Sequence, residues 1–266
     1  MLSSFLAEYV EEIPDYTNVP IEDSGILTEF NKYPLGLTHF EDLYDTIFYS
    51  NLIAKAIDLA RDPRLIIDCG AGSSIPTLLA LKKASRSDIR IIAVDIDPEA
   101  KVVGRRNAEA LGLADRYTFF EKPMEEILES EVVRGQRTLL VSNPPYIPAP
   151  DSVTDHSMVP VNGGEDGSRY LLDILSQYYP AGTTLALLWG SLTSPLEVLP
   201  LMRERFEVLH VDAVRIHFGK YTKDPVIHDH LLRLRREGKV VFDGDREAGE
   251  SQLVLGTIIR AKDRRS

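Results

Sequence analysis

The chain has 266 residues, enough for one large domain or two small ones, and its hydrophobic fraction of 44% is ordinary for a globular protein. A formal net charge of −11 argues against a protein whose affinity comes from nucleic-acid phosphates, and no apolar run reaches the roughly 20 residues of a membrane span. The single cysteine, Cys69, excludes an internal disulfide and a multi-cysteine zinc site. The first residues, acidic and without a basic start, do not resemble a signal peptide, so a cytoplasmic location is expected.

Apolar strands alternate with helices along most of the chain. The sequence predicts strands at 65–69, 89–97, 116–121, 137–142, 183–190, 207–218 and 251–261, and helices at 74–85, 98–111, 123–133, 168–179 and 194–206. Because most strands are apolar throughout, this order indicates an α/β fold with a doubly wound, mostly parallel, seven-stranded Rossmann-like sheet. The last two strands lack a full crossover between them, which is compatible with an antiparallel hairpin.

Two segments lie outside this alternation. Residues 1–50 precede the first strand and are expected to form a small helical cap, which leaves the main domain at 51–266. Residues 219–250 separate the last two strands, and an insertion of this length is typical of a lid or binding element. A solvated excursion is the alternative interpretation.

A glycine turn follows the first strand in "IIDCGAGSSIP". Gly70 and Gly72 permit a tight turn and a close approach by a ligand, and a helix begins directly afterwards. A dinucleotide site competes, but its third glycine would fall at Ile75, and the Asp68 carboxylate would oppose a pyrophosphate. The same carboxylate suits a cation, and S-adenosylmethionine carries a sulfonium and an ammonium but no phosphate.

Polar residues also end two later strands. Asp95 ends the second strand, about where Rossmann-type folds place the acid that holds ribose hydroxyls. Its alternative role as a helix N-cap is filled better by Asp97, which directly precedes a proline. The fourth strand must stop near Ser142, because the prolines of "SNPPY" cannot donate to a sheet ladder.

Together these motifs resemble the class I methyltransferases that methylate glutamine in translation release factors. The resemblance covers roughly residues 39–190 and rests on D-x-G-x-G, A-V-D-I-D-P-E-A, S-N-P-P-Y-I-P and G-G-E-D-G at 163–167, with "HFEDLYDTIFYSNLI" before them. The asparagine tetrapeptide alone is shared with adenine amino-methyltransferases. By this resemblance the expected cofactor is S-adenosyl-L-methionine, bound by Asp45, Thr46, Asp68, Gly70, Gly72, Asp95, Ile96 and Asn143, and the expected catalytic residues are Asn143, Pro144 and Tyr146.

The resemblance also implies how these residues act. The Asn143 side chain and the Pro144 carbonyl would accept hydrogen bonds from the target N–H groups, and Tyr146 would pack on the planar group. Such acceptors aim the nitrogen at the methyl group and stabilise the positive charge that grows on it. No metal is expected.

Three departures from the family pattern bear on the acceptor. The N-terminal segment is short, "LLWGS" replaces the family's glutamate-containing segment, and the insertion at 219–250 is not a standard feature. We therefore predict an enzyme, an N-methyltransferase whose acceptor is a planar NH group of a small metabolite. The alternatives are a protein glutamine methyltransferase, an adenine amino-methyltransferase, disfavoured by charge, and a non-catalytic cofactor-binding subunit. A nicotinamide oxidoreductase competes as another enzyme class, and the oligomeric state is open.

Other residues carry weaker signals. His228 and His230 are expected at the surface, and His217 is expected to be structural, with the cleft as its alternative place. Cys69 is expected to be buried and inert. Trp189 fits the pocket or the core equally. Asp166 would cap the helix at Ser168 or shape the pocket, and Glu165 is similarly open.

Overall fold

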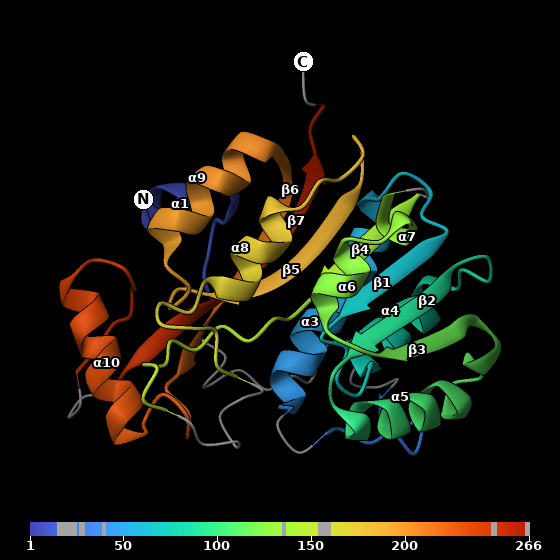
Figure 1. The fold of residues 1–266 in the computed structure, drawn as a ribbon, viewed down its shortest axis with the longest axis horizontal. Coiled ribbons are helices and arrows are strands. Elements are labelled where there is room, and N and C mark those ends of the chain that lie inside the picture. Colours follow the sequence, from blue (N-terminus) through green and yellow to red (C-terminus); the bar gives the residue numbers. More distant parts are fainter. Residues whose placement is uncertain are drawn as a thin grey trace.

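The sheet has the predicted seven strands (Figure 1). The computed structural model describes residues 1–14, 26, 30–38, 41–134, 137–153, 161–245 and 249–263. The strands are β1 (Leu65–Cys69), β2 (Arg90–Asp95), β3 (Tyr117–Glu121), β4 (Thr138–Ser142), β5 (Thr184–Gly190), β6 (Phe206–His217) and β7 (Ser251–Ala261). Their order is β3-β2-β1-β4-β5-β7-β6, and β7 runs antiparallel to both of its neighbours. The mostly parallel α/β sheet and its terminal hairpin are confirmed.

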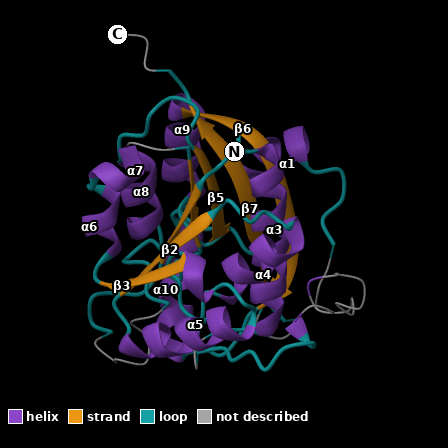
Figure 2. Ribbon diagram, turned by 90° about the vertical axis from the view of Figure 1, so that its right-hand side faces the viewer, coloured by secondary structure: helices purple, strands orange, loops and turns teal. Residues whose placement is uncertain are grey.

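Helices cover both faces of this sheet. The helices are α1 (Leu2–Tyr9), α3 (Leu43–Leu59), α4 (Ile75–Ala84), α5 (Pro98–Ala110), α6 (Met124–Leu128), α7 (Glu131–Arg134), α8 (Arg169–Ser176), α9 (Pro195–Arg205) and α10 (Pro225–Arg236), with a short 3₁₀ turn at Ala114–Arg116. Figure 2 shows α6, α7 and α8 on one face and α3 and α4 on the other. The prediction that Asp97 caps a helix holds, since its carboxylate accepts from the Glu99 N–H.

One helix prediction is wrong in its extent. The segment 123–133 is not a single helix, because the chain breaks between α6 and α7 at Ser130. The Ser130 N–H and hydroxyl both donate to the Ile127 carbonyl, at 3.0 and 2.6 Å, which closes the last turn of α6. Serine readily replaces a backbone partner in this way.

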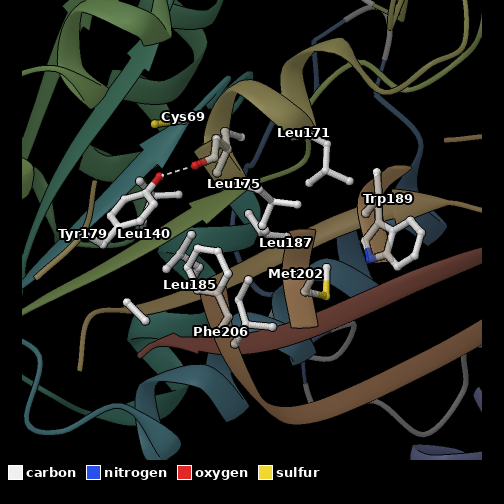
Figure 3. Packing of buried hydrophobic residues seen from close by; sticks show 14 of the residues in the cluster. Cys69, Leu140, Leu171, Leu175, Tyr179, Leu185, Leu187, Trp189, Met202 and Phe206 are labelled. Carbon is white, nitrogen blue, oxygen red and sulfur yellow. Dashed lines mark hydrogen bonds between the residues drawn. The ribbon is translucent and has the colours of Figure 1, made fainter. Parts of the chain in front are cut away.

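The two faces of the sheet build two separate cores. One joins α1, α6, α8 and α9 to the sheet, and the other joins α3 and α4 to it. Figure 3 shows part of the first core, where Leu171 and Leu175 of α8 and Met202 of α9 pack near β5 residues. Trp189 lies in this core with no exposed surface, so the core interpretation of this residue is correct.

The insertion at 219–250 is packed against the rest of the protein. Phe218, Ile227, Leu231 and Phe242 form an apolar cluster with Ile147 of the loop after β4. α10 begins at Pro225, and the Asp224 carboxylate caps it by accepting from two backbone N–H groups. This apolar packing contradicts the interpretation as a solvated excursion.

The helix α3 connects the N-terminal segment to the sheet. It runs across residue 50, where the sequence places the division between cap and main domain, and that division stays a prediction. Asp42 caps α3 by accepting from the Tyr44 N–H. Within the part of the chain that the structure describes, no helix has the length and apolar character of a membrane span.

We predict that Gly256→Ala destabilises the contact between α3 and β7. A Cβ at Gly256 would lie 2.9 Å from Cδ1 of Leu52, a side chain with no exposed surface. Overpacking of this kind costs about 1–3 kcal/mol, so the free energy of unfolding measured in urea should fall by that amount. Gly219→Ala is the control, because a Cβ there meets no heavy atom within 4 Å. Equal unfolding midpoints for the two variants would contradict the proposed packing.

Candidate functional site

The glycine turn and the asparagine loop open onto one cavity. β1 pairs with β4 in parallel so that Cys69 lies opposite Ser142, and the Ser142 hydroxyl donates to the Cys69 carbonyl at 2.8 Å. The residues that follow, Gly70 on one strand and Asn143 on the other, both line a cavity of about 700 Å³. The cavity therefore lies at the carboxyl edge of the sheet, where doubly wound folds bind ligands.

Most of the predicted site residues lie in the wall of this cavity. The predicted residues that line it are Asp45, Thr46, Asp68, Gly70, Gly72, Asn143, Pro144 and Tyr146. Residues of α3 and of the segment before it, of β6 and β7 and of the insertion complete the wall, among them Glu41, Tyr49, His217, Lys220 and Gln252. Glu41 and Tyr49 belong to the quoted segment before the first strand, and the cleft is the alternative place given to His217. The sequence motifs did not indicate Lys220 or Gln252, which only the folded chain brings to this cavity.

Glycine is required in the turn after β1 for two reasons. Gly70 and Gly72 have φ of +69° and +48°, in the left-handed region that disfavours side chains. A Cβ on Gly72 would also lie 2.6 Å from Oε1 of Glu41. That oxygen accepts from the N–H and the hydroxyl of Ser73, at 3.0 and 2.9 Å, so Glu41 anchors the N-terminal segment onto the turn.

Two carboxyl groups in the cavity have raised pKa values. Burial raises the pKa of Asp68 to about 7, although the Thr77 hydroxyl donates to its Oδ2 at 2.7 Å and opposes the shift. Burial and the neighbouring charge of Asp42 raise the pKa of Asp45 to about 7. With Glu41 also in the wall, acidic side chains outnumber basic ones among the described lining residues. The cavity thus favours a cationic ligand, which would draw these groups into their ionised form.

Asp95 and Ile96 lie beside the cavity rather than in its wall. The Asp95 carboxylate accepts from the Gly72 N–H at 2.9 Å through Oδ2 and from the Asp97 N–H at 3.0 Å through Oδ1. Ile96 is 61% exposed. Asp95 therefore supports the glycine turn from the β2 side, and its predicted contact with ribose hydroxyls stays a prediction.

The asparagine loop presents an unsatisfied acceptor. Oδ1 of Asn143 is buried and has no hydrogen-bond partner. In the same loop, the backbone of Tyr146 packs against Gly163 and Gly167. A Cβ added to Gly163 would lie 2.8 Å from the Tyr146 Cα, and a Cβ added to Gly167 would lie 2.5 Å from the Tyr146 carbonyl oxygen. The glycines of G-G-E-D-G are thus needed so that this segment can pack against the loop.

The remaining histidine predictions need correction. His217 is exposed and lines the cavity, so it is not a structural histidine. His228 and His230 are not at the surface, because the apolar packing of α10 buries them to 4% and 5% exposure. The His228 ring bonds to Glu250 at 2.7 Å, and the His230 ring bonds to the Glu165 carbonyl. Among the described residues no group of acidic, cysteine or histidine side chains could hold a metal ion.

The surroundings of Asp166, Glu165 and Cys69 show the role of each residue. Asp166 accepts from the N–H and hydroxyl of Ser168, so it supports the start of α8. Glu165 pairs with Arg233 of α10 at 3.2 Å. Cys69 is buried, and burial raises the pKa of its thiol, in agreement with an inert residue.

Parts of the chain are similar in sequence to known proteins. No protein-family model matches it. It is 39% identical over 104 residues to a release factor glutamine methyltransferase of Chlorobaculum tepidum, covering 39% of this chain and 34% of that protein. It is 35% identical over 158 residues to the enzyme of the same name from Moorella thermoacetica, covering 53% and 52%. A tRNA1(Val) (adenine(37)-N6)-methyltransferase of Aeromonas hydrophila is 37% identical over 114 residues, covering 41% and 44%.

These identities support the resemblance that the sequence motifs indicate. The chain is similar to the release factor glutamine methyltransferases. It has the seven-stranded sheet expected of class I methyltransferases, with β7 antiparallel between β5 and β6. It spans about a third to a half of the length of the two release factor methyltransferases that it matches, at 34% and 52%.

We predict that Asp68→Asn stabilises the ligand-free protein more at pH 8 than at pH 5. With a folded-state pKa of about 7, against the ordinary pKa of 3.8 for an aspartate side chain, Asp68 binds its proton more tightly when folded. Its contribution to stability is therefore lost as the pH rises from about 4 to 7. Asparagine removes this penalty and can still accept from Thr77, so the melting temperature at pH 8 should rise by a few degrees.

The same variant should lose the stabilisation that S-adenosylmethionine brings. Removal of the buried negative charge should weaken cofactor binding at pH 8 by roughly tenfold or more, in line with charge-assisted contacts. Asp97→Asn, which retains a side-chain cap outside the cavity, is the control. Melting curves with and without cofactor at both pH values measure both effects. If Asp68→Asn bound S-adenosylmethionine as tightly as the unmodified protein, Asp68 would have no role in cofactor binding.

Proposed function

We propose that the protein is an S-adenosylmethionine-dependent N-methyltransferase. The observation that carries this proposal is the shared cavity, with an acidic glycine turn on one side and the unpaired oxygen of Asn143 on the other. The first side suits a cationic donor and the second suits an N–H group. The names of the relatives support the same class of reaction, the transfer of a methyl group.

The residues present fit this cofactor. Gly70 and Gly72 leave the backbone of the turn open, and the carboxyl groups of Asp45 and Asp68 border the cavity. Their negative charges would hold the ammonium and face the sulfonium, and Thr46 is part of the same wall. When bound, S-adenosylmethionine supplies an electrophilic methyl group.

The asparagine loop would orient the acceptor nitrogen. Oδ1 of Asn143 accepts one N–H of the acceptor, and the Pro144 carbonyl is the second acceptor of the predicted set. Both oxygens stabilise the positive charge that grows on nitrogen as it is methylated. Pro144 and Pro145 restrict the backbone, so these acceptors keep their direction. Tyr146 offers its ring face to the planar group. The surplus proton leaves to water after transfer, so no general base is needed before it.

The acceptor proposed is the side-chain carboxamide of a protein glutamine. The relatives named release factor glutamine methyltransferases favour it over the small metabolite that we predict from the sequence, which they do not support. A nucleic-acid acceptor is disfavoured by the net charge of −11. The acidic cavity wall also disfavours a nucleic-acid acceptor, because it repels phosphate.

The direct test is incubation with methyl-labelled S-adenosylmethionine and three separate acceptors: a purified bacterial release factor, bulk tRNA and a low-molecular-weight metabolite fraction. We expect label in the release factor, at a glutamine that mass spectrometry locates. Label in tRNA or metabolites instead would replace the proposed acceptor but keep the reaction class. Failure to bind the cofactor in calorimetry would refute the enzyme itself.

A second prediction concerns the role of Asn143. Asn143→Ala should lower kcat by roughly 100-fold or more, because a charge-stabilising contact made in the transition state is lost. Cofactor affinity should change by less than about threefold, since the glycine turn is unaltered. Thr257→Val, a buried position of β7 outside the described cavity wall, serves as the control. Persistent turnover in the Asn143 variant would disprove the role given to this residue.

A further inference from the structure

Gln252 brings a second unsatisfied acceptor to the cavity. It is the second residue of β7 and lies opposite Ile216 of β6. Because β7 runs antiparallel to β5, its first residues lie at the same edge of the sheet as the asparagine loop. Gln252 is 4% exposed, it lines the cavity, and its Oε1 is buried without a hydrogen-bond partner.

A buried side-chain amide oxygen without a hydrogen-bond partner is unfavourable. Val254 lies two residues further along β7, on the same face as Gln252, and it is apolar and fully buried. An apolar residue of similar size at Gln252 would avoid the loss of hydration. The polar group is therefore explained by a partner that arrives with a ligand.

The surroundings of Gly190 show to which end of the cavity Gln252 belongs. A Cβ at Gly190 would lie 3.1 Å from Cδ2 and Cε2 of the Tyr146 ring and 3.2 Å from Oε1 of Gln252. The ring and the amide oxygen thus border the same small space, which only a glycine leaves open. Tyr146 belongs to the acceptor side in the proposed function, so Gln252 belongs there too.

We propose that Gln252 determines specificity by accepting an N–H of the acceptor's primary carboxamide. The two N–H bonds of such a group diverge, so oxygens on two different elements hold it better than one loop does. Asn143 supplies an oxygen from the loop after β4. Gln252 supplies one from β7, and it takes the place of the Pro144 carbonyl as the acceptor of the second N–H. This inference rests on the proposed function, because it assigns a role at the acceptor end of that site.

The arrangement implies selectivity for an unmethylated amide. An N-methylated amide has one N–H left, so it satisfies only one of the two oxygens. The protein should therefore bind a primary carboxamide better than a secondary one and release the monomethylated product. With one hydrogen bond at stake, we expect a preference of about two- to tenfold.

The test measures binding of propanamide, N-methylpropanamide and N,N-dimethylpropanamide to the protein saturated with S-adenosylhomocysteine, by ligand-observed NMR. We expect the unmodified protein to prefer the primary amide. Gln252→Met keeps the length of the side chain but removes the amide, and it should bind the primary and secondary amides equally. Gln252→Glu keeps an acceptor oxygen and should restore part of the preference. Thr257→Val removes another buried, unpaired oxygen of β7 outside the described wall and should leave the preference intact.

The outcomes separate this inference from the proposed function. An intact preference in Gln252→Met, or no binding of any amide by the unmodified protein, overturns the role of Gln252. Transfer of labelled methyl groups, measured independently, decides the proposed function. The melting temperature of ligand-free Gln252→Met should equal or exceed that of the unmodified protein. A clear fall would indicate a structural residue and would also contradict the inference.

Discussion

The pairing of β1 with β4 is the constraint on which the site depends. It places Cys69 opposite Ser142, and the Ser142 hydroxyl bonds to the Cys69 carbonyl across the pair. A shift of β4 by one residue would turn Ser142 to the opposite face of the sheet. With the observed register, the acidic turn and the asparagine loop begin at the same level. A donor held by the first can then face an acceptor held by the second.

The cavity wall concentrates groups whose burial is unfavourable. It contains carboxyl groups whose pKa values burial raises to about 7, together with the unpaired side-chain oxygens of Asn143 and Gln252. The two apolar cores on the faces of the sheet offset this cost. Local destabilisation of this kind, concentrated where ligands bind, is common in enzymes. It also links stability to binding, because each ligand removes the penalty at the groups that it contacts.

The sequence predicts best what is determined locally. Strand-length apolar runs and the prolines and glycines that end them predict the sheet, and the motifs indicate Asp68, Gly70 and Asn143, all of which line the cavity. The anchoring role of Glu41 and the place of Gln252 escape prediction because they depend on contacts with residues distant in the chain. The burial of His228 and His230 is not predicted for the same reason. The polar residues around them make the apolar face of α10 hard to recognise in the sequence.

The two ends of the cavity are built by different parts of the chain. The glycine turn depends on β1, on Asp95 of β2 and on Glu41. The acceptor end depends on glycines that pack against Tyr146 and on Gln252 of β7. The insertion reaches this second end, because His230 and Arg233 of α10 bond to Glu165, next to those glycines. A change in the insertion or in β7 can therefore alter the choice of acceptor while the cofactor end keeps its geometry.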